Sequence, residues 1–370
     1  MSALFSPFAL GALELANRIV VAPMCQYSCD EGLAGDWHLM HLGALALSGA
    51  GLLVIEATAV TREGRITPGC LGLWSDAHAT ALGRVLAALR RHSTMPIAIQ
   101  LAHAGRKGSC EVPWRGGAQI APDDTARGGW PALAPSALPY ADGDAAPLAL
   151  DALQLERIRA GFVAAAQRAE RLGLAAVELH AAHGYLLHQF LSPLANRRSD
   201  HYGGTLANRM RYPLEVFDAV RAALPPALPL GVRISASDFM EHAGVPSWTL
   251  DESTEFARAL HAHGAAYIHV SGGGLAQAQK GPHGPGCLVP YAEHIRRATA
   301  APTVAVGQIT EPAQAEAIVA EGRADLVALG RALLFNPHWP WAAALALGAQ
   351  VHVPPQYRRA QPPGARKLFL

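Results

Sequence analysis

Two histidines and a tyrosine in the segment His-Ala-Ala-His-Gly-Tyr are the strongest candidates for chemistry in this chain. His180 and His183 stand three residues apart, and Tyr185 follows two residues later. Two imidazole N–H groups at the end of a strand can be aimed at one point, which suits a carbonyl or nitro oxygen that gains negative charge. Tyr185 could then deliver a proton to a neighbouring carbon. The alternatives are two structural histidines or a zinc site with His188 as third ligand, and we expect no metal.

A second candidate set consists of glycines that follow the last two apolar segments of the chain. Gly307 and Gly330 stand there, and Arg331 comes directly after the second. Glycine lets backbone amides approach a phosphate closely, and an arginine can neutralise it. Tight turns without a ligand are the alternative. No Gly-x-Gly-x-x-Gly follows the first strand, so a dinucleotide-binding Rossmann unit is not supported.

These candidates fall at the ends of apolar segments that alternate with helical ones. Eight such segments have the near-continuous apolarity that strands buried on both faces require. They are residues 18–23, 52–60, 96–101, 176–180, 230–235, 267–271, 302–306 and 326–330. Apolar residues at helical spacing lie between them, as in residues 153–172. The alternation predicts an α/β fold, a (β/α)8 TIM barrel, whose chemistry lies at the carboxyl ends of the strands.

The whole chain, residues 1–370, is expected to form one domain around this barrel. Three additions are expected: an N-terminal hairpin over residues 2–15, a long excursion over 102–150 after the third strand, and a C-terminal tail over 351–370 at an oligomer interface. A loop as long as the excursion is usually functional.

Composition excludes several partner classes. The chain holds 30 basic and 29 acidic residues, so no basic excess favours nucleic acid. The longest apolar stretch, residues 42–55, is too short for a membrane span. Five scattered cysteines and an N-terminus unlike a signal peptide predict a cytoplasmic protein.

A longer ordered set of motifs resembles the Old Yellow Enzyme family of FMN-dependent ene-reductases, and within it the thermophilic-like bacterial class. The matching residues are 17–27, 56–57, 64–66, 100–107, 134–136, 178–186, 196–204, 208–209, 232–235 and 330–331. In this class a cysteine, here Cys25, stands where other branches carry threonine, and both oxygen-binding residues are histidines. The resemblance runs essentially from end to end.

The resemblance implies a non-covalently bound FMN. Nine residues would contact it: Pro23, Met24, Cys25, Ala57, Gln100, Arg233, Gly307, Gly330 and Arg331. Gly307, Gly330 and Arg331 would hold the phosphate. Arg233 would favour the negatively charged reduced flavin, and Cys25 would tune its potential. Taken alone, Cys25 reads as a small buried hydrophobe, because its sequence neighbours supply no base to activate a nucleophile.

The resemblance also implies the reaction. NADPH or NADH reduces the flavin, and an activated alkene (an enone, enal, maleimide or nitroalkene) is reduced in turn. His180 and His183 would bind its oxygen, Tyr185 would be the proton donor, and Tyr27 would border the substrate. Arg359 in the tail, with the adjacent Arg358 as the alternative, would reach into the active site of a neighbouring chain in a homodimer or a dimer-based tetramer.

Two other functions are weighed against this one. A flavin-binding, stress-related protein without a committed substrate would carry the same motifs. An FMN barrel that reduces uridine in tRNA is disfavoured by a net charge of +1. The larger iron–sulfur relatives of the barrel are excluded, because Cys287 is the last cysteine.

Overall fold

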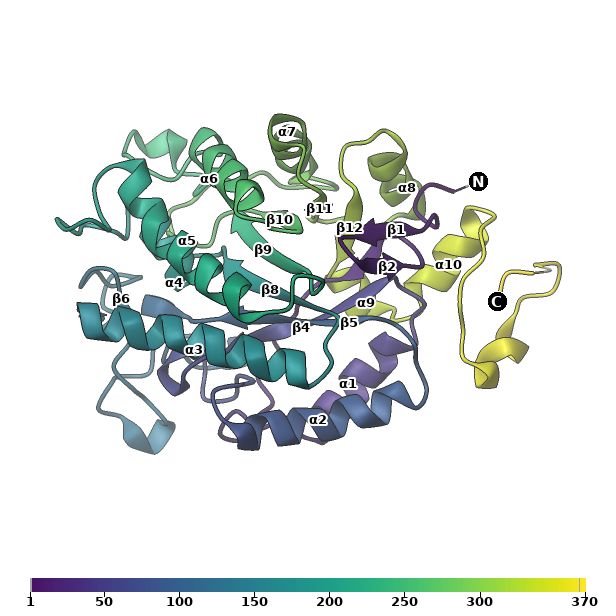
Figure 1. The fold of residues 1–370 in the computed structure, drawn as a ribbon, viewed down its shortest axis with the longest axis horizontal. Coiled ribbons are helices and arrows are strands. Elements are labelled where there is room, and N and C mark those ends of the chain that lie inside the picture. The colour runs from purple at the N-terminus through teal and green to yellow at the C-terminus, as the bar shows by residue number, and fades with distance from the viewer. Residues whose placement is uncertain (1, 366) are drawn as a thin grey trace.

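A closed barrel of eight parallel strands forms the centre of the computed structural model, which describes residues 2–365 and 367–370 (Figure 1). In order around the barrel the strands are β3 (Ile19–Val21), β4 (Leu52–Ala59), β5 (Ile97–Ala102), β8 (Ala176–Ala181), β9 (Leu230–Ser235), β10 (Tyr267–Ser271), β11 (Thr303–Ala305) and β12 (Leu326–Leu329). The predicted (β/α)8 barrel is confirmed, and each strand lies within about two residues of its predicted segment.

Helices surround this barrel on the outside. They are α1 (Asp36–Ala46), α2 (Asp76–Arg90), α3 (Ala152–Arg171), α4 (Leu186–Leu191), α5 (Leu206–Ala223), α6 (Leu250–Ala262), α7 (Val289–Thr299), α8 (Pro312–Ala320), α9 (Arg331–Phe335) and α10 (Trp339–Ala346). The longest, α3, begins where the Asp151 side chain accepts a hydrogen bond from the Gln154 amide at 2.7 Å. Ile158 and Phe162 of its apolar face are fully buried against the barrel, where a Phe→Ala change typically costs about 3–5 kcal/mol.

The strands are apolar on both faces because each face meets a different core. All eight residues of β4 are buried. Leu52 and Val54 join the cluster inside the barrel, whereas Leu53 and Ile55 join the larger cluster between the barrel and the helices. This assignment follows from the period of two along a strand.

A short hairpin closes the amino-terminal end of the barrel. Strands β1 (Phe8–Leu10) and β2 (Leu13–Leu15) pair antiparallel around a turn at Gly11, whose φ is 62°. Leu10 and Leu15 are 0% and 1% exposed and belong to the cluster inside the barrel. The residues before the hairpin are held differently, because Glu316 of α8 accepts hydrogen bonds from the amides of Ala3 and Leu4.

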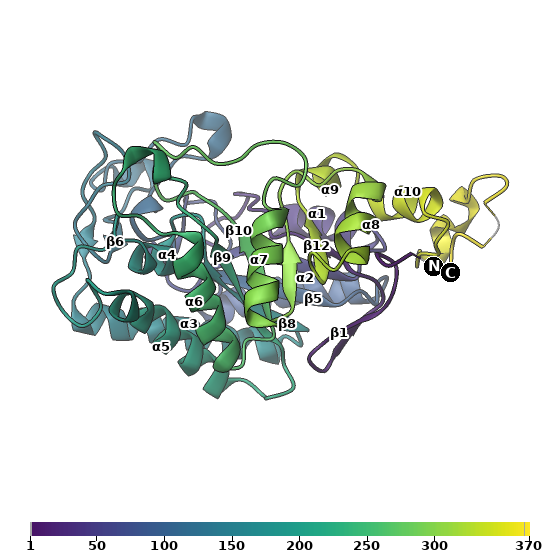
Figure 2. The same ribbon diagram turned by 90° about the horizontal axis from the view of Figure 1, so that it is seen from above.

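The excursion after β5 and the C-terminal tail lie at opposite ends of the molecule. The excursion contains short 3-10 turns and a two-stranded sheet of β6 (Leu133–Ala134) and β7 (Leu148–Ala149), and Figures 1 and 2 both show it far from the tail. The tail packs on α10, where the Trp341 ring lies 5.6 Å from the ring of Tyr357. No helix of the described ranges is both long and apolar enough to cross a membrane.

Candidate active site

A cavity of about 850 Å³ opens at the carboxyl ends of β3, β9, β10, β11 and β12. Six of the nine residues predicted to contact FMN line it: Pro23, Met24, Arg233, Gly307, Gly330 and Arg331. Ser271, the last residue of β10, also lines it. Its volume is in the range of small-molecule and cofactor sites.

The cavity lining suits an anionic ligand with a phosphate group. The Arg233 side chain is 7% exposed, and its Nε has no hydrogen-bond partner among the described residues. Arg331 is exposed at the start of α9 and forms no ion pair with a described side chain. Gly307 has a φ of 120°, and a Cβ added there would come within 3.0 Å of Leu288. These three features fit FMN. The guanidinium groups of Arg233 and Arg331 are available to a negatively charged ligand, and Gly307 lets the ligand approach the backbone closely.

The two candidate histidines are held by a turn that only certain residues tolerate. His183 follows β8 with a φ of 58°, and Gly184 has a φ of 73°. A Cβ at Gly184 would lie 2.3 Å from the Gly274 carbonyl oxygen. The His183 amide donates to Ser235 Oγ at 2.9 Å, and Lys107 Nζ donates to the His183 carbonyl at 2.9 Å. The backbone of this turn is therefore fixed independently of the His183 ring.

A chain of hydrogen bonds sets the proton positions on the two imidazoles. The Ala182 amide donates to His180 Nδ1 at 3.2 Å, so the proton of a neutral His180 is on Nε2. That Nε2 lies 3.3 Å from His183 Nδ1, and His183 Nε2 lies 2.7 Å from Ser271 Oγ. Burial, together with the charge of Arg233, holds the pKa of both imidazoles well below the usual range, so both are neutral.

Tyr185 stands beside this pair as a protonated phenol. Its ring packs edge-on against His180 with the ring centroids 4.9 Å apart. Burial raises the pKa of Tyr185 well above its ordinary value. Lys107 Nζ lies 5.1 Å from the centre of the Tyr185 ring, and burial lowers the pKa of Lys107 to about 8.

The remaining predicted residues are not on the lining of this cavity, and neither are His180, His183 and Tyr185, although His183 contacts Ser271, which lines it. Ala57 and Gln100 are register partners on β4 and β5, and both are buried. Tyr27 lines a separate hollow of about 280 Å³ together with Lys107 and Tyr140. Cys25 is a free cysteine whose pKa is raised well above its usual value by desolvation and by Glu56, so its sulfur is a thiol.

Arg359 and His188 are not brought to the cavity of their own chain. Arg359 is exposed in the tail segment Pro355–Ala360, and the cavity lining includes no described residue of the tail. His188 Nδ1 accepts a hydrogen bond from the Gly184 amide, and its Nε2 lies 3.1 Å from Asp238 Oδ1. His188 therefore does not face the pair, and the described residues contain no cluster of metal-binding side chains.

Three polar partners of the histidines were not expected from the sequence. They are Lys107, Ser235 and Ser271, which stand 52 to 88 positions away from His183 in the sequence. Only Ser271 carried a signal, because it ends a predicted strand directly before three glycines.

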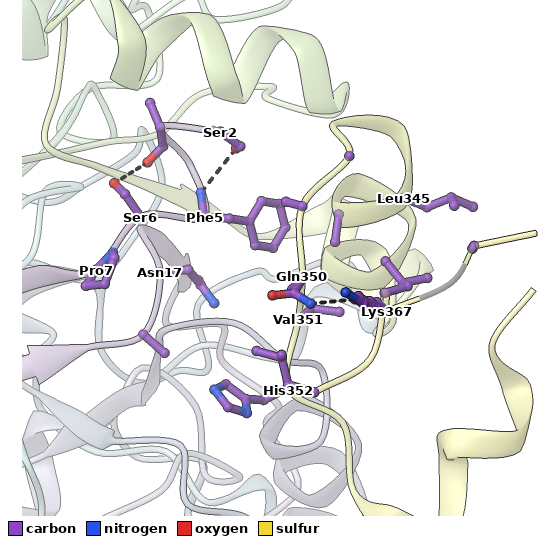
Figure 3. A pocket seen from close by; sticks show the side chains of 18 residues that line it. Ser2, Phe5, Ser6, Pro7, Asn17, Leu345, Gln350, Val351, His352 and Lys367 are labelled. Atoms are coloured by element: carbon purple, nitrogen blue, oxygen red, sulfur yellow. Dashed lines mark hydrogen bonds between the residues drawn. The ribbon is translucent and has the colours of Figure 1, made fainter.

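A larger cavity of about 950 Å³ lies between the N-terminal segment and the tail (Figure 3). Its lining includes Phe5, Asn17 and Val351, and the titratable side chains on it, among the residues that the structure describes, are those of His352 and Lys367. None of the predicted site residues is on its described lining, whereas six of them line the cavity at the strand ends.

A closed parallel barrel with two arginines and close-approach glycines lining a cavity at the carboxyl ends of its strands is typical of barrel enzymes that bind a phosphorylated cofactor. The chain belongs to the NADH:flavin oxidoreductase / NADH oxidase family, which residues 3–348 match. It is therefore an FMN-dependent oxidoreductase, as the sequence predicted.

Similar proteins agree with this membership over the whole chain. The chain is 42% identical over 358 residues to an NADPH dehydrogenase of Geobacillus thermodenitrificans, covering 96% of this chain and 98% of that protein. It is 41% identical to an NADPH dehydrogenase of Listeria innocua, covering 97% and 99% of the two chains. Among solved structures, morphinone reductase superposes with a TM-score of 0.76 at 28% identity, covering 100% of this chain and 96% of that one.

Proposed function

We propose that the protein reduces the C=C bond of alkenes conjugated to a carbonyl or nitro group, with NADPH or NADH as the reductant. The observation that carries this proposal is the pair of neutral imidazoles of His180 and His183 beside the protonated phenol of Tyr185. Hydrogen-bond donors next to a proton donor suit the saturation of an activated double bond. The NADPH dehydrogenases among the similar proteins support the choice of reductant.

The residues around the cavity would hold FMN in two parts. Gly307, Gly330 and Arg331 would bind its phosphate, and Arg233 would lie near the flavin ring together with the other five predicted contacts, Pro23, Met24, Cys25, Ala57 and Gln100. When bound, the cofactor supplies hydride transfer between the nicotinamide and the alkene. Everything else in the reaction depends on side chains of this chain.

His180 and His183 would bind the substrate oxygen and stabilise the negative charge that develops on it. His180 Nε2 already carries a proton, whereas His183 Nδ1 accepts from it in the substrate-free arrangement. For His183 to donate as well, its proton must move to Nδ1, and Nε2 must accept from Ser271. The Ser271 hydroxyl, 2.7 Å away, can accept or donate, so it serves either tautomer. Two donors would then face the oxygen when its charge is largest.

Tyr185 would protonate the carbon next to the activating group. Its pKa is raised by burial, so the phenol holds its proton at neutral pH. Tyr27, with a φ of 51° and a place in the adjoining hollow, would border the substrate.

The tail would complete the site of a second chain. Arg359 is exposed and does not reach the cavity of its own chain, as a residue that serves a neighbour requires. The protein would then be a homodimer or a dimer-based tetramer, and its five free cysteines suit the cytoplasm. A chain ending at Pro355 should bind FMN but lose affinity for the alkene, and full activity of a monomeric form would contradict this part.

The function is tested by following the flavin spectrum of the purified holoenzyme without oxygen. NADPH should bleach the flavin, and cyclohexenone should restore it with formation of cyclohexanone. A stress-related flavin protein without a committed substrate would be bleached but would not be reoxidised by any activated alkene. Tyr185→Phe should slow reoxidation while leaving bleaching unchanged, because only the second half-reaction needs the proton donor. A protein that takes up no FMN would refute the proposal altogether.

A further inference from the structure

A buried carboxylate lies in the barrel wall one layer below the candidate histidines, and no step described so far uses it. Glu178 on β8 precedes His180 by two residues, so both side chains point to the same face of the strand. Glu178 is 0% exposed. The strand register places it beside Gln100 of β5, and it places His180 beside Arg233 of β9. Glu178 thus adjoins two of the predicted cofactor contacts.

Each oxygen of Glu178 accepts a hydrogen bond from a different neighbouring strand. Gln100 Nε2 donates to Oε1 at 2.7 Å, and His269 Nδ1 donates to Oε2 at 3.0 Å. Burial alone would raise the pKa of Glu178, but His269, Arg233 and Gln100 together hold it below its usual value. The carboxylate is therefore ionised, and an ionised carboxylate only accepts hydrogen bonds.

This arrangement leaves the Gln100 amide with one orientation. Its NH₂ group donates one hydrogen to Glu178, which fixes which end of the amide carries the oxygen, and the carbonyl oxygen and the second N–H are left for a ligand. The pyrimidine edge of a flavin offers a single N–H donor, at N3, between two carbonyl oxygens. A carbonyl oxygen on Gln100 complements that N–H, whereas an NH₂ group would complement either oxygen.

The same carboxylate changes the charge below the cavity. Arg233 is buried and lines the cavity, and its positive charge is the one expected to favour the negatively charged reduced flavin. Burial and Arg233 lower the pKa of His269, against the opposite effect of its hydrogen-bond partner Glu178. The negative charge of Glu178 offsets the positive charge of Arg233, so the reduced cofactor is favoured less than Arg233 alone would favour it.

We propose that Glu178 is a positioning residue of the cofactor site, which fixes the Gln100 carbonyl toward the N3–H of FMN and lowers the reduction potential by offsetting Arg233. The inference rests on the FMN site of the proposed function. It adds a residue that acts through its neighbours and does not itself touch the cofactor.

The first test measures the midpoint potential and the FMN dissociation constant of Glu178→Gln. Loss of the negative charge should raise the preference for reduced over oxidised FMN about tenfold, which for a two-electron couple is about 30 mV. FMN binding should weaken, because the new amide cannot hold both donors. Glu178→Asp keeps the charge but draws back from Gln100, so FMN should bind more weakly with a potential near that of the parent protein. Glu316→Gln is the matched control, since its carboxylate binds Ser2, Ala3 and Leu4 and none of these four residues lines the cavity, so its potential should not move.

A second measurement needs no variant and so does not depend on how well Glu178→Gln folds. In the parent protein loaded with ¹⁵N-labelled FMN, the N3 proton should be shifted downfield and protected from exchange with water. Rapid exchange of that proton would overturn the role assigned to Gln100, and an unchanged potential in flavin-loaded Glu178→Gln would overturn the charge effect. Failure to bind FMN in the parent protein refutes the proposed function instead, so the two failures are distinguishable.

Discussion

Replacement of His183 offers the sharpest test of the mechanism, because the structure separates the ring from the turn that carries it. The two bonds that fix the turn, from the amide to Ser235 and from Lys107 to the carbonyl, involve backbone atoms and survive any side-chain change. His183→Ala therefore keeps both backbone contacts and removes the ring, with its N–H donor and its contacts to His180 and Ser271. Loss of one such donor typically lowers the rate by about 10²–10³-fold, or about 2.7–4 kcal/mol of transition-state stabilisation.

The backbone conformation suggests a matched variant. His183 has a φ of 58°, a conformation in which asparagine, like histidine, is several-fold enriched and alanine is not. His183→Asn should keep the turn and supply an amide N–H in place of the imidazole, so it should recover most of the lost rate. The Ala variant should also unfold at a slightly lower temperature than the Asn variant, since left-handed backbone costs an ordinary residue about 1 kcal/mol.

Stopped-flow spectroscopy of the two half-reactions decides the question. Bleaching by NADPH should be nearly unchanged in both variants, whereas reoxidation by cyclohexenone should collapse in His183→Ala and recover in His183→Asn. If reoxidation of the Ala variant stayed within about threefold of the parent rate, the ring would not be an oxyanion donor. An equal loss in both half-reactions would instead indicate damage to the cofactor site.

Three further predictions follow from the same site. Ser271→Ala should lower kcat/KM for the alkene about five- to tenfold, because one hydrogen bond of about 1 kcal/mol is lost. Ser253, a buried serine on α6, is the control, and Ser253→Ala should leave kcat/KM unchanged. Equal effects of the two substitutions would contradict the role of Ser271 in setting the His183 tautomer. Cys25→Ala should still bind FMN and turn over, with a shifted potential, because the thiol is not ionised; abolished turnover at an unchanged potential would refute this. Burial lowers the pKa of Lys107 to about 8 from its ordinary 10.5. Between these two pH values the unfolded chain binds more protons than the folded chain. The contribution of Lys107 to the free energy of unfolding should therefore rise with pH across this window. Urea denaturation at pH 7.5 and 9.5 should show this rise in the parent and not in Lys107→Met, and parallel behaviour of the two would rule it out.

The strands could be predicted from the sequence because their environment is simple. A strand that meets the barrel interior on one face and helices on the other must be apolar along its whole length, as β4 is. The hairpin was placed over residues 2–15, but its strands occupy only Phe8–Leu15, because the preceding residues bond to Glu316. Nothing local to residues 2–7 reveals a carboxylate more than 300 positions away.

The sequence could predict only the part of the candidate site whose residues follow the same strand. Local sequence puts His180, His183 and Tyr185 on one turn, and family resemblance supplies the cofactor. The protons on the histidines could not be predicted, because they depend on Ser271 of another strand. The orientation of Gln100 likewise depends on Glu178. The two residues lie on adjacent strands of the barrel but stand 78 positions apart in the sequence.

The hairpin at the foot of the barrel has a kinetic consequence. Leu10 and Leu15 fill the amino-terminal opening, and the interior above them is packed with side chains such as Val20 and Leu52. In the described chain the cavity therefore opens at the carboxyl ends of the strands and is closed off from the opposite end of the barrel. With the proposed function, the reductant and the alkene would both enter from this side and bind in turn, so initial-rate plots should give parallel lines, and a large excess of the alkene should compete with NADPH.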